Sequence, residues 1–240
     1  MRICFVIAYN GTHFEGSQTQ TRTKNTVLGQ IEHTFHCIGI DSKVIASGRT
    51  DAGVHATAQT CHVDLPPFWN DLEKLHKVLN KMLPSSIIVK SIKQVSKDFH
   101  ARYSATKRLY RYIICEGNRD PFLNDFVTFI DKIDFPAIEE NIKLFIGEHD
   151  FAYFMKSNSD VSSTTRTIYN ARAYKYKNYI ILTFLANGFL RSQIRMMVGS
   201  LLYKNNTQLQ ELLACKKKYS FKPAPANGLY LAKVHYKSMH

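Results

Sequence analysis

The order of strand-like and helix-like runs in the first hundred residues limits the fold more than any other feature of the sequence. Short runs of β-branched and aromatic residues are typical of strands, and apolar residues spaced three and four apart are typical of helices. These patterns predict strands at residues 3–9, 44–46, 57–63 and 87–95, and helices at residues 26–37 and 72–82. The resulting order, β-α-β-β-α-β, is that of the ferredoxin-like pattern, in which two helices pack on one face of an antiparallel sheet.

The second half of the chain repeats this order loosely. We expect strands at residues 109–115, 166–176, 179–186 and 229–234, and helices at residues 135–146 and about 189–203. No motif recurs residue by residue, so the repeat is one of architecture. The sequence therefore predicts an α+β fold with an N-terminal half, residues 1–104, and a C-terminal half, residues 105–240.

The charge of the chain favours a polyanionic partner. Lys and Arg total 32 against 19 Asp and Glu, which gives a net charge of +13 and a pI of about 9.5. Residues 1–104 carry 12 cations and 8 anions (+4), whereas residues 105–240 carry 20 and 11 (+9). A nucleic acid fits this excess best, and we expect the second half to supply more of the binding surface.

Other classes of protein are disfavoured by what the sequence lacks. No apolar run approaches the roughly 20 residues needed to cross a bilayer, so we expect no membrane attachment. The five cysteines are scattered and form no Cys-x-x-Cys pair, which predicts reduced thiols in a cytoplasmic protein. The ten histidines show no zinc-finger or His-Glu-x-x-His spacing, and we therefore expect no metal.

The segment Gly48-Arg49-Thr50-Asp51-Ala52-Gly53 connects two predicted strands and is the best candidate for a reactive site. A loop on a rigid scaffold can present a reactive side chain, and Arg49 could keep Asp51 ionised by charge pairing. The alternative is an ordinary turn, because Asp-Ala-Gly is common turn material. The spacing alone favours the turn.

Two further segments combine cations with aromatic residues or with a half-buried helix face. Residues 99–112, FHARYSATKRLYRY, interleave four cations with three tyrosines, as expected where phosphates are bound and unpaired bases are stacked. Each tyrosine alone could equally belong to the core. In NGFLRSQIR, Arg191 and Arg195 are predicted one turn apart on the penultimate helix, where an arginine either reaches solvent or pairs with a carboxylate.

Together these segments resemble the TruA family of tRNA pseudouridine synthases, in the right order over most of the chain. The motifs that carry the resemblance are GRTDAGVHA, FHARYSATKRLYRY, NGFLRSQIRMMVGSL and PAPANGLYL, at residues 48–56, 99–112, 187–201 and 223–231. Residue by residue, the resemblance implies that Asp51 is the catalytic aspartate, Tyr110 the active-site tyrosine and Arg195 the arginine that pairs with the aspartate. Ser17 and Met196 depart from the family, which usually has tryptophan and asparagine there.

The resemblance also implies the fold, the reaction and the partners. The two ferredoxin-like halves would share a continuous antiparallel sheet, with helices on one face and a basic catalytic cleft on the other. The protein would be a cytoplasmic homodimer that converts uridine to pseudouridine at positions 38–40 of the tRNA anticodon stem-loop, without a cofactor. We expect RNA contacts from the cations and polar residues Gln18, Gln20, Arg22, Arg49, His55, Arg102, Lys107, Arg108, Arg191, Lys216, Lys217 and Lys218.

Two alternatives use the same residues. The chain could be a noncatalytic RNA-binding module with the same basic surface. It could also be a related synthase with a different uridine target, for which Ser17 in an altered loop is the motive.

Overall fold

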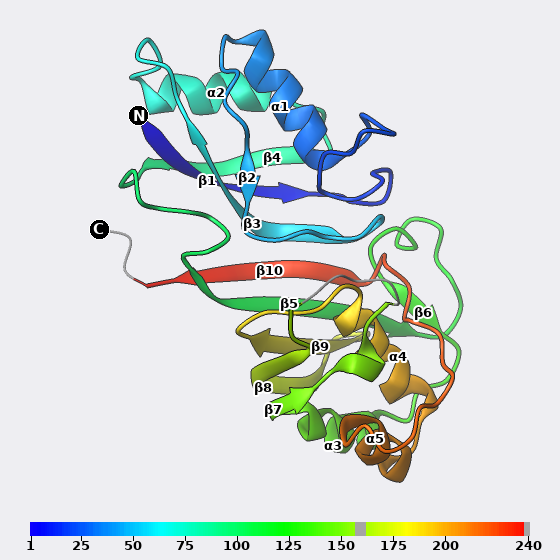
Figure 1. Cartoon of the computed structure of the whole chain (residues 1–240). Helices are drawn as coiled ribbons and strands as arrows, with labels where there is room; N and C mark the ends of the chain where they lie inside the picture. Colours follow the sequence, from blue (N-terminus) through cyan, green and yellow to red (C-terminus); the bar gives the residue numbers. More distant parts are fainter. Residues whose placement is uncertain (157–161, 238–240) are drawn as a thin grey trace. The chain divides into compact units, whose positions relative to one another are not determined.

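A computed structural model describes residues 1–156 and 162–237. The chain divides into two compact units, one formed by residues 1–106 and 230–240 and the other by residues 107–229. Both units combine a mostly antiparallel sheet with helices, so the predicted α+β class is confirmed (Figure 1). Within the described residues, no helix is long and apolar enough to span a membrane.

The first unit has the predicted β-α-β-β-α-β order (Figure 1). Its elements are β1 (Arg2–Tyr9), α1 (Val27–Cys37), β2 (Ile45–Ala46), β3 (His55–Asp64), α2 (Leu72–Met82) and β4 (Ile87–Gln94), joined by the end of the chain in β10 (Leu229–Tyr236). Strand β1 lies between β3 and β4, antiparallel to both, and β2 pairs antiparallel with β3. Strand β10 pairs in parallel with the start of β3, through Tyr230 opposite His55 and Leu231 opposite Ala56.

The helices of the first unit begin where their capping residues predict. The side chains of Thr26 and Asp71 accept hydrogen bonds from the backbone N–H groups of Gly29 and Lys74, which satisfies donors at the starts of α1 and α2. Both helices cover the same face of the sheet (Figure 1). There Phe5 of β1 meets Phe35 of α1 edge to face, with ring centroids 5.6 Å apart.

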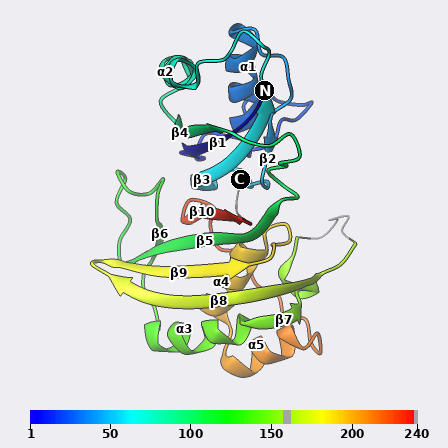
Figure 2. The same cartoon turned by 90° about the vertical axis from the view of Figure 1, so that its left-hand side faces the viewer.

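The second unit is built on strands β5, β9 and β8 (Figure 2). Its elements are β5 (Ala105–Glu116), β6 (Thr128–Ile130), α3 (Phe135–Asn141), the 3-10 helix η1 (Ile142–Phe145), β7 (Gly147–Asp150), the 3-10 helix η2 (Ala152–Phe154), β8 (Thr165–Tyr176), β9 (Tyr179–Ala186), α4 (Gln193–Tyr203) and α5 (Asn206–Leu213). Strand β9 is antiparallel to β5 and β8, β7 pairs with β8, and β6 runs parallel to β5. A cluster of buried phenylalanine rings fills the core: Phe145, Phe151, Phe154 and Phe184.

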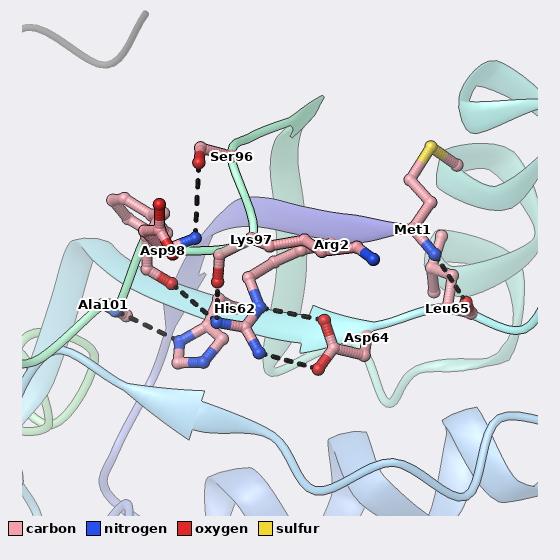
Figure 3. A network of polar contacts seen from close by, with 10 residues as sticks. Met1, Arg2, His62, Asp64, Leu65, Ser96, Lys97, Asp98 and Ala101 are labelled. Carbon is pink, nitrogen blue, oxygen red and sulfur yellow. Dashed lines mark hydrogen bonds and ion pairs between the residues drawn. The ribbon is translucent and has the colours of Figure 1, made fainter.

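A polar network ties the start of β1 and the end of β3 to the segment that follows β4 (Figure 3). The guanidinium of Arg2 donates two hydrogen bonds of 2.8 Å to the carboxylate of Asp64 and two more to the carbonyl oxygens of Lys97 and Phe99, at 2.5 and 3.1 Å. These bonds raise the pKa of Arg2 and lower the pKa of Asp64. His62 belongs to the same network, because its Nδ1 accepts a hydrogen bond of 3.1 Å from the N–H of Ala101.

The stability of the protein is expected to depend on the protonation of His62. Burial, with the positive charge of Arg2 and the neighbouring His100, lowers the pKa of His62 to about 4, against a smaller opposite effect of Asp64. Since the unfolded chain binds the proton near pH 6.5, stability is fully present above that pH and falls as the pH drops toward 4, by up to about 3 kcal/mol. Urea unfolding across this range measures the effect.

His62→Asn tests this pH dependence, because the asparagine oxygen can replace Nδ1 as acceptor and does not titrate. The variant is expected to lose less stability than the wild type between pH 6.5 and 4. The exposed His33→Asn is the matched control and should follow the wild type. Identical pH profiles for the wild type and His62→Asn would contradict the assignment.

Candidate active site

In the first unit, Asp51 lies in the short loop between β2 and β3, in the position that the sequence predicted. The N–H of Val54 donates to the carbonyl oxygen of Asp51 at 3.2 Å, and Gly53 between them has a φ of +76° that favours glycine. The loop is therefore a tight turn, and the Asp51 side chain on it is half-buried.

Ser17 braces this loop from the segment after β1. Its hydroxyl oxygen accepts a hydrogen bond of 2.8 Å from the N–H of Thr50, and its own N–H donates to the carbonyl oxygen of Thr50 at 3.1 Å. The Thr50 hydroxyl is bonded in turn to the Tyr9 hydroxyl at 2.8 Å. Because both backbone polar groups of Thr50 are held, the position of Asp51, the next residue, is held as well.

A second set of contacts braces the two ends of the loop. Gln59 of β3 accepts a hydrogen bond from the Ser47 hydroxyl at 2.5 Å and donates to the carbonyl oxygen of Gly48 at 2.7 Å. At the other end, His55 is buried, accepts the N–H of Gly11 on Nδ1 at 3.0 Å, and stacks on Tyr230 with centroids 4.7 Å apart. His55 thus helps to hold the loop, and its expected RNA contact stays a prediction.

Replacing Ser17 with alanine is expected to destabilise the protein by about 1–3 kcal/mol, because it leaves the buried N–H of Thr50 without its acceptor. Urea unfolding measures the loss. Thr19→Ala is the matched control, since it removes a hydroxyl that only donates to Glu32 at an exposed site, and it should change stability by less than about 0.5 kcal/mol. Equal stability of Ser17→Ala and the wild type would contradict the proposed brace.

In the second unit, Tyr110 lies on β5 opposite Phe184 of β9 and is only 8% exposed. Its ring meets Phe189 edge to face, with centroids 5.2 Å apart. Two residues earlier on the strand, the guanidinium of Arg108 donates to the carbonyl oxygen of Asn187 at 3.0 Å. The turn after β9 is therefore held beside Tyr110.

Tyr112, which shares a face of β5 with Tyr110, is a core residue. It is fully buried, and its hydroxyl is bonded to the hydroxyl of Thr128 at 2.7 Å and to the carbonyl oxygen of Pro225 at 2.9 Å. Burial raises its pKa well above the usual value. Both readings of the tyrosine-rich segment thus hold within one strand, because some of its aromatic residues are core and others are more exposed.

Arg195 lies in the first turn of α4 and is fixed by the segment that follows α5. Its Nε donates to the carbonyl oxygen of Ala224 at 2.7 Å, and its own carbonyl oxygen accepts the N–H of Ala224 at 2.8 Å. One turn later, Gly199 lets this segment approach closely, since a Cβ there would be 2.2 Å from the carbonyl oxygen of Lys222. The direction of the Arg195 side chain is set by these contacts.

The predicted start of this helix is wrong. Helix α4 begins at Gln193 and not near residue 189, because Ser192 adopts a left-handed conformation with φ of +59°. The turn is closed by Leu190, whose N–H donates to the Gln193 side chain at 2.7 Å and whose carbonyl oxygen accepts the Gln193 N–H at 3.1 Å. Arg191 therefore lies exposed in the loop and does not share a helix face with Arg195.

The other residues with expected RNA contacts lie in several places. In the loop after β1, Arg22 donates to Gln20 at 3.0 Å and Gln20 donates to the carbonyl oxygen of Glu15 at 2.7 Å. The remaining residues are at least partly exposed: Gln18, Arg49, Arg102, Lys107, Arg191, Lys216, Lys217 and Lys218. Among them, Lys107 lies over the ring of Tyr169, at 4.6 Å from its centroid.

Sequence reasoning missed the braces of the loop. Ser17 entered only as a departure from the family, and Gln59 and Tyr230 were not singled out. A signal existed for Gln59, since a polar amide in the middle of an otherwise apolar strand indicates a buried hydrogen bond. No pattern in the sequence links Ser17 to Thr50, which lies 33 residues away.

Comparison with known proteins gives consistent matches over most of the chain. A family model described as tRNA pseudouridine synthase matches residues 5–104 and 142–237. The tRNA pseudouridine synthase A of Campylobacter jejuni strain RM1221 is 38% identical, over 98% of this chain and all of that protein. The proteins of the same name from Anoxybacillus flavithermus and Wolinella succinogenes are 38% and 37% identical, covering 98% and 97% of this chain and 98% and 93% of those proteins.

Proposed function

Because the chain belongs to the tRNA pseudouridine synthase family, we propose that it converts uridine to pseudouridine at positions 38–40 of the tRNA anticodon stem-loop. The observation that carries the proposal is the half-buried Asp51 on a loop fixed by Ser17, Gln59 and His55. Such a preorganised loop can keep a carboxylate at one place beside a substrate.

The reaction breaks the bond between C1′ of the ribose and N1 of the uracil, turns the base over, and joins C1′ to C5. The proton on C5 is lost and N1 gains one, so the isomerisation is redox-neutral and needs no cofactor. Attack on C1′, attack on C6 and removal of the C5 proton each require an ionised carboxylate beside the sugar and base. We assign that carboxylate to Asp51.

We assign Arg195 and Tyr110 to the same active site. The Nε of Arg195 is bonded to Ala224, which favours the terminal nitrogens as partners of the Asp51 carboxylate. An arginine beside the carboxylate would keep it charged in a site closed to water. Tyr110, held edge to face against Phe189, would stack on the uracil after it has left the helix stack.

The proposal includes a tRNA partner, a homodimer and a cytoplasmic location. The net charge of +13 supports binding to a polyanion. We assign phosphate contacts to the exposed cations Arg49, Arg102, Lys107, Arg108, Arg191 and Lys216–Lys218, with Gln18, Gln20, Arg22 and His55 in the loops nearest Asp51 in the sequence. The two ferredoxin-like halves, residues 1–104 and 105–240, would form the cleft that receives the anticodon arm.

The lysine patch, Lys216–Lys218, is expected to bind RNA phosphate without acting in the chemistry. Lys217 lies over the ring of Tyr219 at 5.1 Å and Lys218 over the ring of Tyr153 at 5.9 Å, which holds both ammonium groups in place. Changing all three lysines to alanine should weaken tRNA binding and reduce the dependence of log K on log salt by up to about three phosphate contacts.

Binding isotherms at several salt concentrations test the patch, with the single-turnover rate at saturating tRNA as the control for chemistry. We expect that rate to be unchanged. An unaltered salt slope would remove the patch from the RNA interface.

The activity itself is tested with an unmodified tRNA that has uridine at positions 38, 39 and 40. We expect pseudouridine, mapped chemically, at these positions and not elsewhere. If the wild-type protein binds the tRNA and leaves every uridine unchanged, the noncatalytic RNA-binding alternative holds. Pseudouridine at other positions would support the synthase with a different target.

A further inference from the structure

The segment that joins β4 to β5, which we call the 96–104 arch, is fixed to the first unit more firmly than its position in a connection requires. Phe99 and Ala101 are buried and pack with Cys4 of β1. The backbone N–H of Ala101 donates to His62, and its carbonyl oxygen accepts the hydroxyl of Tyr236 at 2.7 Å.

The Arg2 guanidinium adds a further anchor, since it binds the carbonyl oxygens of Lys97 and Phe99 while Asp64 neutralises its charge (Figure 3). The base of the 96–104 arch is thus held by side chains from β1, β3 and β10. Anchors of this kind keep an exposed tip in one conformation.

The tip of the arch presents an aromatic ring to solvent. Tyr103 is 76% exposed, and its ring stacks on the ring of His100 with centroids 4.3 Å apart and an angle of 30° between the planes. The guanidinium of Arg102 lies 5.6 Å from the centroid of the same ring. A large apolar ring that remains so exposed does not contribute burial to the core.

The turn beneath Tyr103 is preorganised. Nδ1 of His100 accepts the N–H groups of Arg102 and Tyr103, each at 3.2 Å. Ser104 closes the turn, because its hydroxyl accepts the N–H of His100 at 3.0 Å and its N–H donates to the His100 carbonyl oxygen at 2.9 Å. The ring of Tyr103 can therefore receive a ligand with little loss of conformational freedom.

We propose that Tyr103, supported by His100, is a stacking platform for an unpaired base of the RNA substrate, and that Arg102 contacts the adjoining phosphate. Aromatic faces bind unpaired bases by stacking, and a cation beside the ring binds the backbone that carries the base. The inference rests on the proposed function only for the identity of the ligand as RNA. The platform is a binding site separate from the residues assigned to the chemistry.

The test compares Tyr103→Ala with Tyr103→Phe, using an anticodon stem-loop RNA with uridine at position 39. Loss of one stacked base is expected to raise the Kd of Tyr103→Ala by about 5- to 150-fold, and Tyr103→Phe should bind as the wild type does because stacking does not need the hydroxyl. The single-turnover rate at saturating RNA should stay within about twofold of the wild type in both variants.

Tyr176→Ala is the matched control. Tyr176 is 57% exposed on β8 and, like Tyr103, has a neighbouring cation over its ring, the ammonium of Lys177 at 5.7 Å. Its removal should leave the Kd unchanged. Circular dichroism and urea unfolding of the variants check that the arch has not lost its fold.

The stacked base is identified by placing 2-aminopurine at each loop position of the RNA in turn. At one position, its fluorescence should differ between the complexes with wild type and Tyr103→Ala, and should be the same with wild type and Tyr103→Phe. A wild-type Kd for Tyr103→Ala, an equal loss for Tyr176→Ala, or an equal loss for Tyr103→Phe would each overturn the platform. If the wild type binds the RNA without forming pseudouridine, the proposed function fails while the Kd comparison still decides the platform.

Discussion

Replacement of Asp51 with asparagine is expected to reduce pseudouridine formation by about 10³-fold or more. Asparagine keeps the size of the side chain, and the loop should keep its conformation because its braces use Thr50, Gly48 and Gly11 and not the carboxylate. What is lost is the negative charge that attack or proton removal requires. Single-turnover assays at saturating tRNA measure the change.

Binding and a second aspartate provide the controls for this experiment. The Kd for tRNA should change little, since one anion fewer does not weaken binding to a polyanion. Asp41→Asn alters an exposed carboxylate of the same unit that is bonded to His36, and it should retain full activity. Full activity of Asp51→Asn would show that the carboxylate assigned to the reaction is the wrong one.

Gly199→Ala is expected to destabilise the protein by about 1–3 kcal/mol, although alanine is normally preferred to glycine inside a helix. The added Cβ would lie 2.2 Å from the carbonyl oxygen of Lys222, so the segment at residues 222–224 must move away from α4. Because Ala224 in that segment holds Nε of Arg195, we also expect a lower single-turnover rate. Thermal unfolding should show a Tm lower by about 2–4 °C for each kcal/mol.

Gly188→Ala is the matched control, since a Cβ there would meet only the flexible side chain of Arg166, at 3.8 Å. It should change the Tm by little. A Gly199→Ala variant as stable as the wild type would mean that the segment can shift without cost. A destabilised variant with the wild-type rate would mean that the Ala224 contact does not position Arg195.

Long elements with strong periodicity were predictable because their signals are local. The order of the first unit, the helices α1 and α2, and strands β8 and β9 all agree with the structure to within a few residues. Capping residues and the proline that follows α2 fix the ends of these helices, and both signals lie within the segment that they end.

The missed elements depend on partners outside the segment. Strand β7, Gly147–Asp150, is short and polar, and it is a strand only because it pairs with β8. Strand β6 likewise has three residues and needs β5 beside it. Helix α5 was overlooked although Asn205 and Gln208 form a capping box, which is a readable signal. The predicted helix at residues 135–146 ends at Asn141 and continues as the 3-10 helix η1.

For the candidate site, the sequence predicts the types of residue but not their support. Asp51 was found because a glycine-bracketed acid between two strands can be recognised locally. Its braces join residues 11 to 44 positions apart along the chain, and Tyr230 reaches His55 from the last strand. Contacts of this range follow from the fold, and no local pattern contains them.

The pairing of β10 with β3 has a consequence for how the protein is made. Residues 1–106 leave the ribosome first, but the strand that completes their sheet is translated last, after residues 107–229. At 5–20 residues per second, the edge of β3 at His55 waits unpaired for on the order of 10 s. The ring of Tyr230 reaches His55 only then, so the loop that carries Asp51 gains its last support when synthesis is nearly complete. Nascent chains are thus expected to reach the tRNA-modifying state only near the end of translation.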